Sequence, residues 1–223
     1  TELENLRLIS GASDILSLAN IHLAQKAKLI QNLTRLEADY VIVDLGAGTS
    51  YNVLDFFLVA DKKVVVLIPQ PISIQNAYAF IRNTVYRRLS QLVSQDPSLQ
   101  SLNKTAMDTN NELKLRTVNE LLQISEDVNG TEAMKTLQKE IQSIQPFVIT
   151  NMVRANQDRG AGRVIQRVAE KYLMIQSTDL GSIFYDQKLY ATVTEMLPLT
   201  GLIQSSEVFA SVYHMAVTLM HND

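Results

Sequence analysis

Asp39 to Ser50 reads DYVIVDLGAGTS, an apolar run that ends in a carboxylate and a glycine-rich bend. Tyr40 to Val43 is largely β-branched, which is typical of a strand covered on both faces of a parallel sheet. Asp44 would stand at the carboxyl end of that strand, where open α/β sheets bind ligands. Gly46 and Gly48 let backbone amides approach an anion closely, and an Asp here suits Mg²⁺, directly or through water. The stretch predicts half of a nucleotide site.

The other half of such a site is a phosphate-binding loop, which carries glycines, a lysine and a Ser or Thr at the start of a helix. Neither GxxxxGK(S/T) nor KGGxGK(S/T) occurs in the 223 residues. The chain also starts at Thr1 without a methionine, so we expect a fragment that lacks an N-terminal segment. Because phosphoryl transfer depends on positioning and charge neutralisation by that loop, we expect no catalytic residue in this chain and no hydrolysis by it alone.

The composition, 46% hydrophobic and 19% charged, is ordinary for a globular protein. The absence of cysteine from the sequence excludes disulfides, thiolate zinc ligands and cysteine nucleophiles. A net charge of −3 gives no strong signal for nucleic acid or anionic lipid. No apolar run reaches the ~18 residues of a membrane-spanning helix. We predict a cytoplasmic protein.

Strand and helix patterns alternate along the chain, which predicts an α/β fold with a mostly parallel, doubly wound sheet flanked by helices. The predicted strands cover residues 5–10, 40–43, 63–68, 146–150 and 178–183. The predicted helices cover residues 20–37, 51–60, 73–92, 158–173 and 205–220. Ser73 is the predicted N-cap of the third of these helices.

The alternation is interrupted between residues 94 and 145. Two helical patterns lie there, from Leu115 to Leu122 and from Met134 to Ile144, separated by Asn129-Gly130. Thr131 is a candidate cap for the second helix. The spacing predicts a helical insertion, 94–145, between two parts of one α/β core, 1–93 and 146–223.

Five stretches together resemble the MinD/ParA family of P-loop ATPases, closest to its FlhG/FleN-like branch of flagellar-number regulators. They are LISGAS at 8–13, DYVIVDLGAGTS at 39–50 with VLDF and AD downstream, PQPISIQNAYAFIR at 69–82, FVITNMV at 147–153 and LGSIFYD at 180–186. The resemblance covers most of the chain outside the insertion. Gln70 stands where the family has Glu, and Phe184 stands where it has Pro.

By this resemblance, Asp44 would be the Walker B carboxylate near Mg²⁺, and Gly46 to Gly48 would be the switch loop that senses the γ-phosphate. Asn151 would lie against the adenine ring. The full-length parent would bind ATP and Mg²⁺, form a homodimer when ATP is bound, hydrolyse ATP slowly and change its affinity for a protein partner. The resemblance therefore implies an ATPase switch.

Less specific interpretations stand beside each of these. Asp44 could cap a turn at a strand end, Asn151 could be a turn residue, and Asp186 is expected to be a local cap. The chain as a whole could be a non-catalytic interaction module of the same family, docking through the apolar stripes of the insertion near residues 115–144.

Two surfaces invite comparison with that family's DNA and membrane contacts. Arg159, Arg163 and Arg167 recur at four-residue spacing near Arg154, and a solvated helix face is the expected explanation. The closing helix has apolar residues on one side, but no Lys or Arg follows Lys188, whereas membrane anchors need a basic polar face. We expect that helix to pack on the core.

Overall fold

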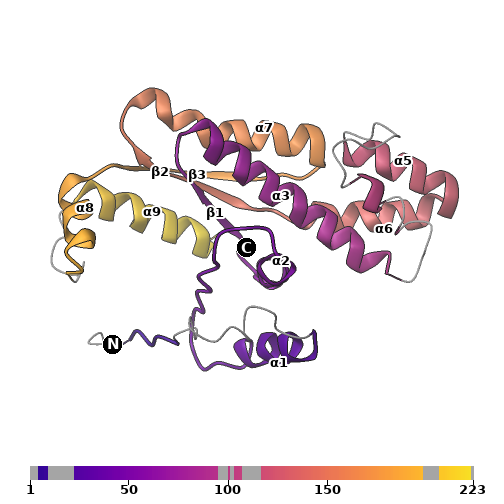
Figure 1. The fold of residues 1–223 in the computed structure, drawn as a ribbon, viewed down its shortest axis with the longest axis horizontal. Helices are drawn as coiled ribbons and strands as arrows, with labels where there is room; N and C mark the ends of the chain where they lie inside the picture. The colour runs from indigo at the N-terminus through magenta and orange to yellow at the C-terminus, as the bar shows by residue number, and fades with distance from the viewer. Residues whose placement is uncertain are drawn as a thin grey trace. The chain divides into compact units, whose positions relative to one another are not determined.

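The computed structural model describes residues 5–9, 23–94, 100, 103–106, 117–197 and 206–221. The chain divides into two compact units, Thr1–Gly46 and Ala47–Asp223. The second unit holds a small parallel sheet flanked by helices (Figure 1). The predicted α/β class with parallel strands is thereby confirmed, and the doubly wound P-loop arrangement stays a prediction.

In its described residues the first unit contains helix α1, Leu23–Leu33, followed by a stretch without regular structure. The helix confirms the middle of the one predicted over residues 20–37. The strand predicted at residues 40–43 is wrong, because no ladder forms there and Tyr40 and Ile42 are 69% and 91% exposed. A strand is completed by hydrogen bonds to a neighbour, and no described residue pairs with this stretch. Its β-branched composition alone does not suffice.

The strand predicted over residues 5–10 has the same outcome in its described part. Residues 6–9 have no regular structure, and Leu8 and Ile9 are exposed. Ser10 lies outside the described residues. Here too an apolar run without a paired neighbour does not form a strand.

The sheet of the second unit has three parallel strands in the order β1-β2-β3. They are β1, Val64–Leu67, β2, Phe147–Val153, and β3, Thr178–Phe184. Each confirms a predicted strand, with small shifts at the ends. The register pairs Val64 with Phe147 and Phe147 with Thr178, so the longer β2 lies in the centre.

Helices α3, Pro71–Leu92, and α7, Ala161–Leu173, follow β1 and β2 respectively and lie on one side of the sheet, while α9, Glu207–His221, lies on the other (Figure 1). α3 and α7 pack against each other, and α9 packs on β3. When two crossovers between parallel strands have the same hand and run in the same direction across the sheet, their helices lie on the same face. The sheet is thus covered on both faces.

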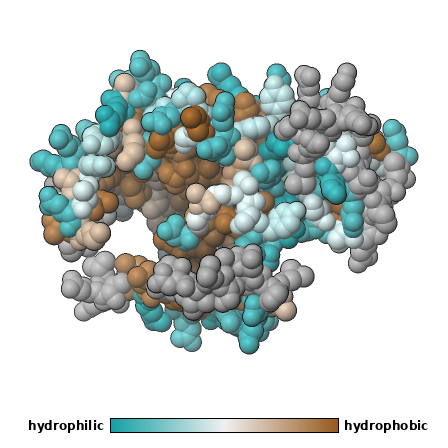
Figure 2. All heavy atoms as spheres, in the orientation of Figure 1, coloured by the Kyte–Doolittle hydropathy of each residue, from teal (hydrophilic) through white to brown (hydrophobic). Residues whose placement is uncertain are grey.

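Side chains alternate between the two faces along β2. Phe147 packs with Leu180 and Met215 of α9, whereas the fully buried Val148 is directed to the face of α3 and α7. Figure 2 shows apolar residues gathered in the middle of the view, where the sheet lies, with polar residues around them. Met215 bears out the prediction that the closing helix packs on the core, although Val212 on the same helix is 45% exposed.

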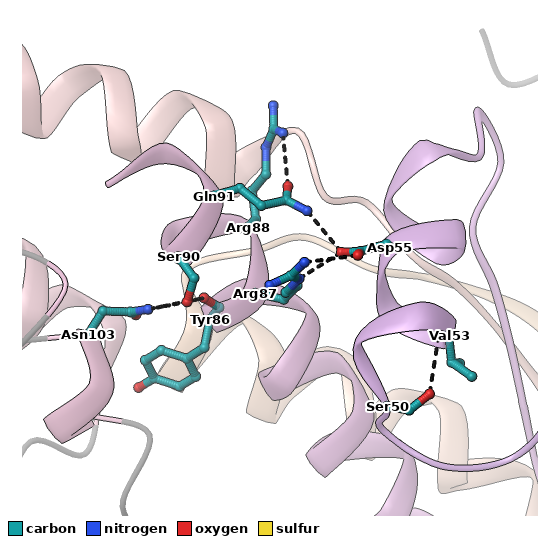
Figure 3. A network of polar contacts seen from close by, with 9 residues as sticks. All are labelled: Ser50, Val53, Asp55, Tyr86, Arg87, Arg88, Ser90, Gln91 and Asn103. Carbon is teal, nitrogen blue, oxygen red and sulfur yellow. Dashed lines mark hydrogen bonds and ion pairs between the residues drawn. The ribbon is translucent and has the colours of Figure 1, made fainter. Parts of the chain in front are cut away.

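Helix α2, Tyr51–Val59, is held on α3 by a buried ion pair. Arg87 donates to both carboxylate oxygens of Asp55, at 2.7 and 2.9 Å, and Gln91 Nε2 donates to Asp55 Oδ1 at 2.9 Å (Figure 3). The guanidinium also lies 4.4 Å from the Tyr51 ring centroid. A bidentate pair of this kind fixes direction as well as distance, so it sets how α2 crosses α3.

The predicted helical hairpin is confirmed by α5, Val118–Asn129, and α6, Thr131–Gln142. Thr117 and Glu120 form a capping box at the start of α5. The predicted cap Thr131 is wrong, because Gly130 takes the N-cap position with a φ of 82° that favours glycine. The Thr131 hydroxyl instead donates to Glu126. The predicted start at Leu115 lies outside the described residues.

Two further local predictions need correction. α3 begins at Pro71 with Gln70 as N-cap, because proline suits the first helical turn; Ser73 instead accepts a hydrogen bond from the Ile68 N–H. The helix predicted from residue 158 starts at Ala161, after a 3-10 turn over Asn156–Gly160. A short helix that the sequence analysis did not predict, α8, covers Gln187–Thr194.

Candidate functional site

The glycine-rich bend after Asp44 spans the boundary between the two units. Asp44 is exposed and lies in irregular chain at the end of the first unit, so the predicted strand-end position is not there. Gly48, in the second unit, has a φ of +113°, which bears out the need for glycine at that place. Gly46 is not among the residues with positive φ, and a Cβ added there would meet nothing within 4 Å. Of the two glycines, only Gly48 is required by the backbone.

Asn151 lies near the carboxyl end of β2, as predicted, and its side chain contacts the backbone of the next residue. Its Oδ1 accepts the N–H of Met152 at 2.8 Å, where Met152 has a φ of 57°. A left-handed conformation costs a non-glycine residue about 1–2 kcal/mol. The pairing of β2 with β3 shifts between Thr150 and Val153, at the same place. Asn151 thus lies inside β2 at an irregularity of the ladder, so the interpretation of it as a turn residue after a strand is wrong, and its amide N–H groups remain the chemistry available for a ligand.

Two arginines stack on aromatic rings at this end of the sheet. Arg154, just after β2, lies 4.3 Å from the Tyr185 ring centroid, and Arg159 lies 4.6 Å from that of Phe184 at the end of β3. Asp158 holds the connecting turn by accepting the backbone N–H groups of residues 154 and 155. The carboxyl ends of β2 and β3 thus carry flat, cationic and aromatic groups of the kind that stack on bases.

These stacks are the part of the site that sequence reasoning missed. The sequence pattern marks Phe184 only as a replacement for proline, and it gives Tyr185 no role beyond its place in the LGSIFYD stretch. The available signal was an aromatic pair directly after one predicted strand and an arginine directly after its predecessor. Adjacent parallel strands bring such positions to the same edge.

Asp186 is a cap, as predicted. Its carboxylate accepts the N–H groups of Lys188 and Leu189, at 2.7 and 3.1 Å, at the start of α8. The side chain is therefore used by the helix.

Of the predicted basic stripe, only Arg163 and Arg167 lie on α7. Arg159 belongs to the preceding turn and stacks on Phe184. The predicted three-arginine helix face is therefore wrong, because the helix begins later than its pattern indicated. Lys171 continues the spacing in the last turn of α7.

Among the described residues, those with shifted pKa values do not lie at the carboxyl ends of β2 and β3. Burial lowers the pKa of Lys63, before β1, and its ammonium donates to the Ala60 carbonyl at 2.6 Å. Burial also raises the pKa values of Tyr78 and Tyr86 on α3. The hydrogen bond to Asp55 raises the pKa of Arg87. These shifts accompany packing around α3 and mark no acid–base pair at the candidate site.

Whether Mg²⁺ fits the described residues depends on how many carboxylates lie close together. In the described part of the chain no three His, Cys, Asp or Glu side chains gather to hold a metal ion. Mg²⁺ commonly binds through one or two carboxylates together with waters and substrate phosphates. Asp44 alone suits that arrangement only with oxygen atoms from a bound nucleotide, so any metal here would arrive with its ligand.

The four predicted binding residues divide between the two units. Asp44 and Gly46 belong to the first, and Gly48 and Asn151 belong to the second. That they share one site therefore stays a prediction. Among the described helices none has the length and apolarity needed to cross a membrane. The sequence matches no protein-family model and no curated protein, so the MinD/ParA resemblance also stays a prediction.

Proposed function

We propose that this chain contributes the switch loop and the adenine end of an ATP site in a MinD/ParA-type molecular switch. In this proposal Asp44 holds Mg²⁺ through water, the loop from Gly46 to Gly48 responds to the γ-phosphate, and Asn151 lies beside adenine. The switch forms a homodimer when ATP is bound and hydrolyses ATP slowly. The chain supplies no catalytic side chain of its own.

The observation that carries the proposal is the carboxyl edge of β2 and β3. Asn151 precedes a left-handed Met152, and the two arginine–aromatic stacks follow within a few residues. Conformations of this cost are stored where the surrounding structure fixes them, and they gather at binding sites. Edges of parallel sheets at the carboxyl side are also where α/β proteins bind nucleotides. Geometry and resemblance thus point to the same edge.

Photolabelling with 8-azido-ATP and Mg²⁺ tests the adenine end directly. In the protein made from its complete reading frame, we expect label on peptides that contain residues 151–158 or 184–186, and excess ATP should prevent it. Tyr185→Ala should lower labelling by about fivefold or more, since base stacking contributes about 1–3 kcal/mol. Tyr213→Ala, on the exposed side of α9, is the matched control and should label as the unchanged protein does.

Label on other peptides only, or no label, would overturn the adenine assignment. The Mg²⁺ end has its own test in the same protein. Asp44→Ala should abolish ATP turnover, because removing the metal-holding carboxylate removes charge neutralisation of the phosphates. Turnover that survives Asp44→Ala would show that this residue has no such role.

The alternative, an interaction module that docks through the insertion, finds no large exposed apolar side chain among those described on α5 and α6. The large apolar side chains of α5 and α6 are turned inward: Leu121, Leu122 and Ile141 are at most 3% exposed. Among the side chains described for the two helices, no large apolar one is exposed. The apolar stripes of the hairpin are used for packing, so the nucleotide switch is the better-supported function.

A further inference from the structure

An apolar groove lies between α3 and α7, two helices that pack against each other. It encloses about 370 Å³ and is lined by Ile74, Gln75, Tyr78, Val164, Val168 and Tyr172. The residues from α3 lie one turn apart, and those from α7 follow each other at four-residue intervals. Val164 is 45% exposed, so the groove is open to solvent. Its apolar floor runs along the helix axes for about two turns, or ~12 Å.

The α7 wall of the groove carries positive charge. The arginines of α3 are used elsewhere, since Arg87 pairs with Asp55, Arg88 pairs with Glu140 and Arg82 donates to the Ala106 carbonyl. Burial raises the pKa of Tyr78, and Tyr172 acts on it from the opposite wall. On that wall the Lys171 ammonium lies 5.1 Å from the Tyr172 ring centroid. A cation of α7 therefore stands at the end of the groove that carries the two tyrosines.

The positive border continues along α7. Arg163, Arg167 and Lys171 recur every four residues, which places them in one row beside the valines of the groove. Glu170 is the one acidic residue of this helix. The apolar floor and the cationic row of α7 together define the occupant: it must be apolar on one side and acidic on the flank that faces α7.

We propose that the groove between α3 and α7 docks an amphipathic helix of a partner protein, with aliphatic anchors at i, i+3 or i+4 and i+7 and with Asp or Glu on the flank that faces α7. This goes beyond the proposed ATP site. Two helical turns of groove match the span of such anchors, and helix-in-groove recognition reads them in this spacing. The tyrosine hydroxyls offer hydrogen bonds to side chains at one end of the bound helix.

A membrane surface fits the groove less well. Insertion into lipid needs apolar side chains that protrude, whereas Tyr78, Val168 and Tyr172 are half-buried in a recess between two helices. A second copy of the chain also fits less well. Among the described helices α5 is the most acidic, but its apolar residues Leu121 and Leu122 are already buried. The stated partner helix remains the occupant with matching shape and charge.

Two synthetic helical peptides of about 18 residues, or five turns, test the proposal. Both carry Leu at the anchor positions; one has Glu at the flanking positions and the other has Lys. We expect the Glu peptide to bind the protein with a Kd of about 10 μM by fluorescence anisotropy, and the Lys peptide to bind at least about tenfold more weakly. Equal binding of the two peptides, or binding of neither, would overturn the proposal.

Variants locate the binding. Val164→Glu should weaken binding of the Glu peptide by about tenfold or more. Val212→Glu on α9 changes an equally exposed valine (45% for both) and should leave that binding unchanged. Arg167→Glu should lower the preference for the Glu peptide, and Lys139→Glu on α6 makes the same charge change outside the groove. Circular dichroism of each variant establishes that it is folded. If the α9 or α6 control alters binding as much as the groove variant, the peptide binds elsewhere and the assignment is wrong.

The competing occupants give separate results. Sedimentation of the protein with vesicles of phosphatidylcholine and phosphatidylglycerol, sensitive to Val164→Glu, would assign the groove to lipid and overturn the proposal. Self-association that Val164→Glu abolishes, measured by analytical ultracentrifugation, would assign it to a second copy and overturn it equally. Peptide binding that depends on both the anchors and the acidic flank supports a partner helix.

Discussion

Two short apolar stretches of nearly the same composition have opposite structures in this protein. Residues 40–43, YVIV, have no ladder partner among the described residues, and Ile42 is 91% exposed. Residues 64–67, VVVL, form β1, which pairs with β2 along its whole length, and Leu67 is 2% exposed. Both are β-branched runs that follow a helix and precede a turn. Only the second has a neighbour.

The comparison shows what a strand requires beyond its own residues. Backbone N–H and C=O groups must be paired, and in a sheet the pairing comes from another segment of the chain. β1 receives its partner from β2, which lies about 80 residues later and is itself flanked by β3. Composition decides which segments can fill a strand position, and long-range pairing decides which of them do.

The largest difference should come from truncating one side chain in each stretch. Leu67→Ala removes a buried side chain between the sheet and its helices and should lower the free energy of unfolding by about 2–4 kcal/mol. Ile42→Ala removes an exposed one and should change it by less than about 0.5 kcal/mol. Urea unfolding followed by circular dichroism measures both. A cost for Ile42→Ala close to that for Leu67→Ala would mean that residues 40–43 are buried in solution and the comparison fails.

The same contrast explains how much of the fold and of the candidate site can be predicted from the sequence. Most segments with strong local signals formed as predicted, among them β1, β2, β3 and the hairpin around Gly130. The failures at residues 40–43 and 6–9 concern pairing, which no local pattern contains. In the site, Gly48 and the end of β2 were predicted, but the stacking of Arg154 on Tyr185 was not. That contact joins two segments about 30 residues apart, and only the register of β2 on β3 brings them together.

The helix between the two stretches offers a second test, because α2 is fixed to α3 through the ion pair of Asp55 with Arg87. Asp55→Ala leaves the Arg87 guanidinium, 19% exposed, without its bidentate partner and should cost about 2 kcal/mol. If the pair acts as a unit, the double variant Asp55→Ala/Arg87→Met should cost less than the sum of the two single changes. Chemical denaturation of all four proteins gives the coupling. Additive costs would mean that α2 is held by its apolar packing, including the Phe57–Phe80 edge-to-face contact at 4.8 Å, and not by the ion pair.

The two glycines of the bend between the two stretches should differ in how much their substitution by alanine changes stability. Gly48→Ala places a Cβ on a residue with a φ of +113° and should destabilise the protein by about 1 kcal/mol. Gly46→Ala is the matched control, since a Cβ there meets nothing within 4 Å, and it should change stability by only a few tenths of a kcal/mol. Thermal unfolding of both variants measures the difference. Equal costs at the two positions would show that the backbone of the bend differs in solution from the one described.

The smallest effect on stability concerns Lys63, directly before β1. Burial lowers the pKa of Lys63, the charge of Asp61 opposes this shift, and the charge of Arg88 adds to it. Between the folded pKa and the unfolded value near 10.5, the unfolded chain binds more protons than the folded one. Stability should therefore rise with pH through this window, and the rise should be modest because water still reaches a half-buried ammonium. Lys63→Gln does not titrate, so the free energy of unfolding of the unchanged protein minus that of the variant should increase from pH 8 towards pH 10.5. Tyr78 and Tyr86, whose raised pKa values act in the opposite direction at high pH, are common to both proteins and cancel in this difference. If this difference in the free energy of unfolding stays flat or falls with pH, Lys63 is exposed to water in the folded protein, as residues 40–43 are.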